Sequence, residues 1–145
     1  MRFMMLMIPE VYQGTKGKNV GPNFAPPADA VEKMTKFNED LVKAGALITG
    51  DGLHPLSSGA RVSYAGGRPH VTDSPFTESK EVLGGYWMIQ VKSKEEAIEW
   101  AKRIPAASGD VVEIRQVQEM DDFPPEVQKA AKSELVKGKT SKGGR

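Results

Sequence analysis

The 145-residue chain contains no cysteine and only two histidines. The absence of cysteine excludes disulfide bonds, thiolate metal sites and a cysteine nucleophile, and it fits a reducing compartment. Sites for transition metals in proteins are built mainly from cysteine and histidine. With so few of these ligands available, we expect no metal.

Long hydrophobic runs are absent as well. The first ten residues, MRFMMLMIPE, hold one positive charge and six consecutive apolar residues before a proline. A secretory signal has a longer apolar region, and a membrane helix needs about 20 apolar residues. We therefore expect a cytoplasmic protein with no membrane partner.

Neither sign of charge is in excess, because 20 lysines and arginines face 19 aspartates and glutamates. No net field draws the chain to nucleic acid or to an anionic membrane. Basic residues gather only in the last segment, KSELVKGKTSKGGR, which has no aromatic residue on which a base could stack. This pattern favours a solvated tail over nucleic-acid contact.

Glycine-rich phosphate loops are also missing. The stretch GDG at 50–52 and the pair Gly66-Gly67 do not open a helix, as a phosphate loop must. No nucleotide cofactor is therefore expected, and none of another kind.

The first half of the chain predicts a strand, a long loop, a helix and a second short strand. Phe3 to Ile8 is an unbroken apolar run of the length of a buried central strand. Residues 10–27 show no periodicity and predict a loop. A helix is expected to open at Pro27 and to end at Gly45, followed by a strand at 46–50. The apolar face of this helix consists of Val31, Met34, Phe37, Leu41 and Ala44.

The second half predicts a hairpin, a strand, a helix and a strand. Residues 61–65 and 68–73 flank two glycines that suit a tight hairpin turn. Residues 85–91 form a strand, and Ser93 with Glu96 has the spacing of a capping box that opens the second helix. Residues 111–117 complete the core as its last strand.

This order of elements predicts an α+β fold of the ferredoxin-like βαββαβ type, with an inserted β-hairpin and both helices on one face of an antiparallel sheet. The other sheet face would be bare, and a second copy of the chain would cover it, so we expect a homodimer. We assign residues 1–122 to this domain, 123–137 to a C-terminal helix, and 138–145 to a disordered basic tail.

Folding alone explains several residues of the segment DSPFTESKEVLGGYW, residues 73–87. Asp73 can accept a backbone hydrogen bond from the turn that it starts, and Pro75 fixes its own φ angle. Gly84-Gly85 permits close approach of a neighbour or ligand. Tyr86 and Trp87 should point to opposite faces of the strand.

The stretches Asp73-Ser74-Pro75-Phe76, Leu83-Gly84-Gly85-Tyr86 and Glu96 to Ala101 resemble the YCII-related family, in particular its DGPF branch, with Ser74 in place of the glycine. The resemblance implies a ferredoxin-like fold that pairs into a dimeric α+β barrel, and it leaves the chemistry open. A better-studied branch uses a histidine near the first helix with an aspartate as a catalytic dyad. The first helix here contains no histidine, so the dyad is not transferred.

Five residues are the candidates for a site. Glu78 would act as acid or base, with Lys80 or Arg61 as the anchor of an anionic substrate; a surface ion pair is the alternative interpretation. His54 could serve as a general base, a role that histidine often takes near neutral pH, but an exposed loop residue is the favoured interpretation. Asp73 is placed with Arg61 and Lys80 among the substrate-binding residues, although its turn role is sufficient to explain it.

These candidates suggest a protein that binds a small acidic or phenolic compound in a dimer cleft, or a proton-transfer or lyase-type enzyme acting on one. The alternative is a non-catalytic dimeric binding or regulatory protein, since members of the DGPF branch are associated with sigma-factor systems. Whether the chain is an enzyme stays open at this point.

Overall fold

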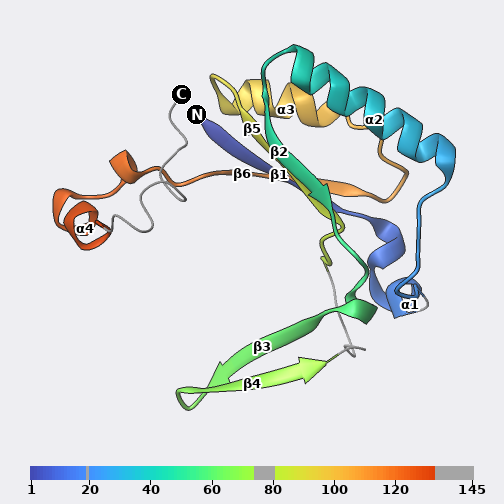
Figure 1. The fold of residues 1–145 in the computed structure, drawn as a ribbon, viewed down its shortest axis with the longest axis horizontal. Helices are drawn as coiled ribbons and strands as arrows, with labels where there is room; N and C mark the ends of the chain where they lie inside the picture. The colour runs from blue at the N-terminus through green and yellow to red at the C-terminus, as the bar shows by residue number, and fades with distance from the viewer. Residues whose placement is uncertain (19, 74–80, 133–145) are drawn as a thin grey trace.

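The computed structural model describes residues 1–18, 20–73 and 81–132. Its centre is a four-stranded antiparallel sheet in the order β2-β5-β1-β6, which confirms the expected α+β, ferredoxin-like fold (Figure 1). The strands are β1 (Arg2–Ile8), β2 (Leu47–Gly52), β5 (Gly85–Gln90) and β6 (Val111–Gln116). The long helices are α2 (Ala28–Lys43) and α3 (Lys94–Lys102).

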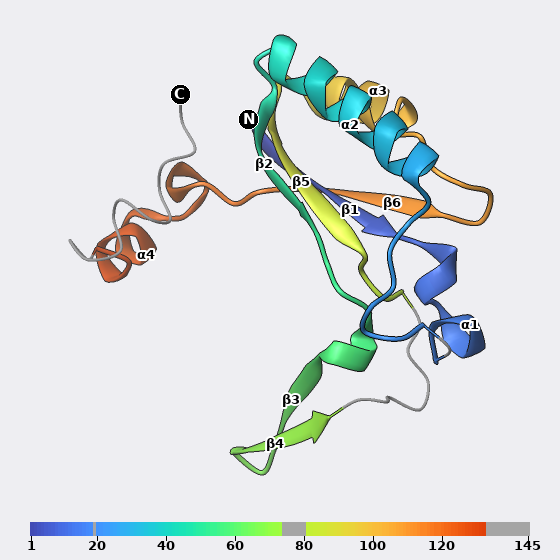
Figure 2. The ribbon, with the colours of Figure 1, turned by 45° about the vertical axis from the view of Figure 1, so that its right-hand side comes forward.

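Both long helices cover the same face of the sheet (Figure 2). Along β1 the side chains alternate, so Phe3, Met5 and Met7 are buried beneath the helices. Along β5 the buried residues Trp87 and Ile89 continue this apolar layer. The alternation follows from the two-residue period of a strand whose one face is covered.

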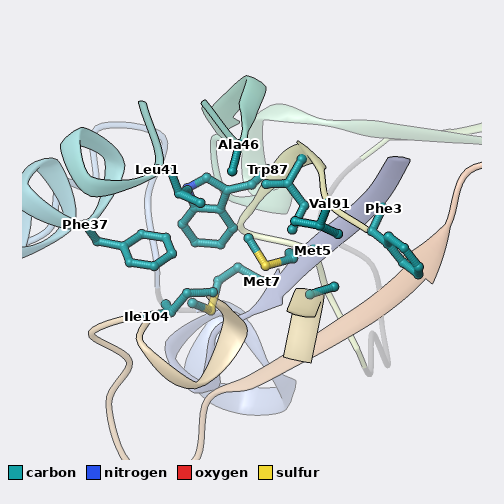
Figure 3. Packing of buried hydrophobic residues seen from close by; sticks show 11 residues of the cluster. Phe3, Met5, Met7, Phe37, Leu41, Ala46, Trp87, Val91 and Ile104 are labelled. Carbon is teal, nitrogen blue, oxygen red and sulfur yellow. The ribbon is translucent and has the colours of Figure 1, made fainter. Parts of the chain in front are cut away.

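An aromatic group at the centre of the core fixes α2 to the sheet and to α3. The ring of Phe37 meets Trp87 edge to face, with centroids 5.7 Å apart, and Trp100 of α3 in the same way at 6.3 Å. Leu41, one helical turn further along α2, is fully buried (Figure 3). Burial of each such side chain stabilises the fold by about 1.5–3 kcal/mol.

The N-terminus of α3 is capped, as the Ser93 and Glu96 spacing predicts. The Ser93 hydroxyl accepts a hydrogen bond from the Glu96 backbone N–H at 3.1 Å. The Glu96 carboxylate, however, accepts from the backbone N–H of Lys92 at 2.8 Å, one residue before the position that a capping box requires.

The hairpin is confirmed as a separate two-stranded sheet of β3 (Ala60–Ala65) and β4 (Arg68–Asp73). Gly66 and Gly67 connect the strands with φ angles of 59° and 75°, a left-handed pair that favours glycine. The hairpin extends away from the layer formed by α2 and α3 (Figures 1 and 2).

Residues 10–27 were expected to lack regular structure, and this expectation was partly wrong. A 3-10 turn at Glu10–Tyr12 and a short helix α1 at Gly14–Lys18 occupy the first half of the segment. Glycine disfavours helix in isolation, but the backbone bond from Gly17 N–H to Gln13 C=O (3.0 Å) and the side-chain contacts of Gln13 hold the turn in place.

Beyond β6 the chain forms a 3-10 turn at Met120–Asp122 and the helix α4 at Pro125–Ala130. The guanidinium of Arg2 binds both carboxylate oxygens of Glu119 at 2.7 and 2.9 Å, which attaches this segment to the start of β1. The predicted basic tail lies outside the described residues, so the expected division after residue 122 stays a prediction. Within the described ranges, no helix has the length and apolar content to cross a membrane.

Candidate functional site

Two adjoining hollows lie beside α2. The larger, about 710 Å³, is bounded by α2, the segment that follows β1, and residues 105–110. The smaller, about 330 Å³, is bounded by α2 and the paired ends of β2 and β5. Both are lined by Met7, Met34, Asn38 and Gly84. We call them the apolar hollow and the polar hollow, and together the bipartite cleft.

The apolar hollow has walls of proline, aliphatic and aromatic side chains. Phe24 packs edge to face on Tyr12 with ring centroids 5.8 Å apart, and Val11 and Val31 stand on other parts of the wall. Phe24, Val11 and Val31 are all more than one-third exposed. A concave surface of exposed apolar groups is typical of a site for an apolar ligand.

The side chain of Gln13 fastens one wall of the cleft. Its amide nitrogen donates to the carbonyls of Pro9 (2.7 Å) and Val82 (2.9 Å), and its oxygen accepts from the Val82 N–H (2.7 Å). The segment after β1 is thereby held against the chain that leads into β5. Such a fully bonded amide favours a preformed wall over one that must order on binding.

Gly84 and Gly85 allow the close approach that the sequence predicts. A side-chain carbon at Gly84 would lie 2.5 Å from Cγ of Pro9, and one at Gly85 would lie 3.0 Å from the carbonyl oxygen of Asp51. Only glycine lets these backbone segments meet without displacement.

Asp110 lines the apolar hollow, but its carboxylate holds backbone segments together. Its two carboxylate oxygens accept hydrogen bonds from the backbone N–H groups of Glu10 and Ala107, each at 2.9 Å. Glu10 in turn binds the ammonium group of Lys16 at 2.7 Å. Asp110 therefore fixes the loop before β6 to the end of β1.

At the edge of the polar hollow, on the sheet face away from α2, a phenol and a carboxylate lie side by side. The Tyr86 hydroxyl donates to Oδ2 of Asp51 at 3.0 Å, because the two residues are partners in the β2–β5 ladder. This hydrogen bond, with the negative charge of Asp51, raises the pKa of the Tyr86 phenol above its usual range. Tyr86 is therefore a proton donor at neutral pH.

Asn38 presents a third polar group. Its Oδ1 accepts from Nε1 of Trp87 at 2.8 Å, which determines how the amide is oriented. Its Nδ2 group makes no hydrogen bond within the part of the chain that the structure describes. Asn38 lines both hollows, so this donor lies where they meet.

Tyr12 joins the wall of the apolar hollow to the segment just beyond β2. Its hydroxyl donates to the carbonyl of Leu53, just beyond β2, at 3.1 Å. Burial of the ring raises the pKa of the Tyr12 phenol, which keeps this donor protonated.

The residues chosen from the sequence lie elsewhere or outside the described residues. His54 is exposed beyond β2, and Arg61 and Asp73 lie on the exposed hairpin. Arg61 pairs with Thr72 and Asp73 pairs with Ala60, so their side chains are on opposite faces of the hairpin. None of these three lines either hollow. Glu78 and Lys80 fall in residues 74–80, outside the described ranges, and the roles of all five stay predictions.

Sequence reasoning missed both Asn38 and the Asp51–Tyr86 pair. Asp51 was considered as part of GDG, which does not form a phosphate loop, and the described residues contain no cluster of His, Cys, Asp or Glu suited to a metal. The available signal for the pair was the match of GDG in β2 with GYW at the start of β5, which the strand register places opposite each other. Asn38 gave no signal, because its contact with Trp87 depends on how α2 packs on the sheet.

Two comparisons with known proteins found sequences similar to this chain. Residues 1–121 match the YCII-related domain family. An uncharacterised protein of Rhizobium meliloti (strain 1021) is 34% identical over 75 residues, which is 52% of this chain and 60% of that protein. The match thus covers less than two-thirds of the relative's length. On the strength of the family match, the chain belongs to the YCII-related family.

Proposed function

We propose that the bipartite cleft binds a small, largely apolar molecule that carries a hydroxyl group of the phenolic type. The apolar hollow would take the hydrocarbon part, and the Nδ2 group of Asn38 would donate to the hydroxyl oxygen. The observation that carries the proposal is that the polar hollow adjoins the apolar one and shares lining residues with it. Apolar walls with a few convergent polar groups are the general pattern of ligand sites.

The charges of the lining favour a phenol over a carboxylic acid. Glu10, Asp51 and Asp110 line the two hollows, and no lysine or arginine is among their described lining residues. An anionic ligand would meet like charges without a compensating cation. Of the acidic and phenolic classes that the sequence suggests, the phenolic class fits better.

A binding protein would need only these contacts. A proton-transfer enzyme would need a base as well, and the Asp51 carboxylate lies on the opposite sheet face, where it accepts the one hydroxyl proton of Tyr86.

We further propose that the working form is a homodimer. Met4, Leu6 and Ile8 of β1 alternate with the buried residues and face away from α2 and α3, and Met88 of β5 lies beside Met4 in the ladder. No described helix covers this sheet face, on which Tyr86, Glu113 and Arg115 flank the apolar residues of β1 (Figure 2). A second copy presenting the same face would cover it through a two-fold interface.

A matched series of probes tests the ligand class. We expect 4-ethylphenol to bind more tightly than ethylbenzene, which lacks the hydroxyl, and than 4-ethylbenzoate, which carries a negative charge. Isothermal titration calorimetry at neutral pH measures all three. Equal affinities for the three, or a preference for the benzoate, would refute the assignment of the polar hollow.

A further inference from the structure

We propose that the β3–β4 hairpin is an arm that crosses to a second copy of this chain and contacts the acidic segment 119–130 of that copy. The inference rests on the proposed homodimer, and the experiment below separates the failure of one from the failure of the other.

The hairpin has one apolar face that nothing in its own described chain covers. The ladder pairs Val62 with Val71 and Tyr64 with Pro69, which places the four side chains on one side. Val62, Tyr64 and Val71 are 51%, 77% and 67% exposed. Three large apolar groups so open on a projecting arm indicate a surface that is covered in the assembled protein.

The other face of the hairpin is basic. Arg68 pairs with Ala65, and His70 pairs with Ser63, so both side chains lie opposite the apolar face. An arm with an apolar face and a basic face fits a partner surface that offers apolar groups beside carboxylates.

The segment after β6 offers that combination. Asp121, Asp122 and Glu126 are exposed carboxylates, and none of them forms an ion pair within the described ranges. Val127 of α4, 41% exposed, adds an apolar side chain beside them. The fourth acidic residue, Glu119, is already paired with Arg2.

The hairpin and the acidic segment leave the sheet at opposite ends of the strands. β2 ends at Gly52, opposite Gly85, which itself pairs with Met7 near the end of β1. β6 ends at Gln116, which pairs with Phe3 near the start of β1. Figures 1 and 2 show the hairpin and the segment with α4 extending away from the layer formed by α2 and α3.

Charge then selects between two ways of pairing the open sheet faces. If the strands of the second copy run in the same direction, each basic hairpin meets the other basic hairpin. If they run in the reverse direction, each hairpin meets the acidic segment of the partner, and both contacts form at once by two-fold symmetry. Like charges disfavour the first pairing and opposite charges favour the second.

Cross-linking tests this contact directly, because the natural chain has no cysteine to interfere. Full-length Tyr64→Cys and Val127→Cys chains, one of them tagged, are refolded together and treated with a long, flexible bis-maleimide. We expect a covalent product that contains one chain of each kind, and little product from Tyr64→Cys alone. A product from Tyr64→Cys alone, or no product at all, would overturn the arm contact.

Analytical ultracentrifugation of the unmodified chain separates the two proposals. A monomer would refute the homodimer itself, whereas a dimer that gives no mixed product would refute only the arm. We expect Arg68→Glu to raise the dimer dissociation constant about two- to fivefold, and Arg68→Glu with Glu126→Lys to restore it. Lys36→Glu, an exposed change on α2, is the control that should leave the constant unchanged; an equal effect of this control would also count against the arm.

Discussion

The Tyr86 hydroxyl and the Asp51 carboxylate, on neighbouring strands, are joined by a hydrogen bond of 3.0 Å. The strand register places both side chains on the sheet face away from α2, together with Met88. Trp87 lies on the other face and donates to Asn38 of α2. The sheet thus separates the Asp51–Tyr86 pair from the amide that points into the cleft.

Asp51→Asn should lower the pKa of Tyr86 toward the usual value for tyrosine, near 10. The substitution removes the negative charge that disfavours the phenolate and weakens the hydrogen bond that holds the proton. Spectrophotometric titration of tyrosine, with the signal of Tyr86→Phe subtracted, measures the shift. An unchanged titration curve would show that the pair does not exist in solution.

The raised pKa of Tyr86 also predicts how the stability of the fold changes with pH. The folded state binds the phenolic proton more tightly than the unfolded state, so this contribution is fully present below the unfolded pKa, near 10, and is lost as pH rises through the folded pKa. Urea unfolding of the natural chain and of Tyr86→Phe at pH 7 and above pH 10 should therefore show a smaller difference at high pH. A difference that grows with pH would contradict this sign.

Gly84→Ala should destabilise the fold by about 1–3 kcal/mol, because the added carbon would lie 2.5 Å from the ring of Pro9. Gly52→Ala is the matched control, since a carbon added at Gly52 meets no atom within 4 Å. Chemical unfolding compares the two variants. Equal losses of stability would show that the segments do not approach as closely as described.

Glu119→Gln should weaken the attachment of the C-terminal segment at pH 7 by about 1–2 kcal/mol. The hydrogen bond to Arg2 lowers the pKa of Glu119, so the stabilisation is present above the unfolded pKa and is lost as pH falls through the folded pKa. Urea unfolding should therefore separate the variant from the natural chain at pH 7 and not near pH 2. Glu32→Gln, at an exposed position of α2, removes the same charge and is the control.

Asn38→Asp should separate ligand binding from folding. Aspartate keeps an oxygen that can accept from Trp87 Nε1 but removes the Nδ2 donor and adds a negative charge to the cleft. We expect a loss of 4-ethylphenol affinity of about tenfold, as for one hydrogen bond to a partner left unsatisfied, with stability lowered far less than in Asn38→Ala. Affinity equal to that of the natural chain would exclude Asn38 from the site.

The sequence predicted the fold much better than the site. Apolar periodicity, the glycine pair of the hairpin and the Ser93 cap depend on residues close in the chain, and all three predict the observed elements. The polar group depends on long-range contacts, such as Trp87 reaching Asn38 over 49 positions. The DSPF motif drew attention to residues 74–80, which lie outside the described ranges, so assignment to the DGPF branch stays a prediction.

A crystal structure of the chain with 4-ethylphenol tests the central claim most directly. The proposed function predicts the ring in the apolar hollow against Met34 and Phe24, with the phenolic oxygen within hydrogen-bond distance of Nδ2 of Asn38. A ring bound outside the bipartite cleft, or one inside it with its oxygen turned away from Asn38, would contradict the proposal.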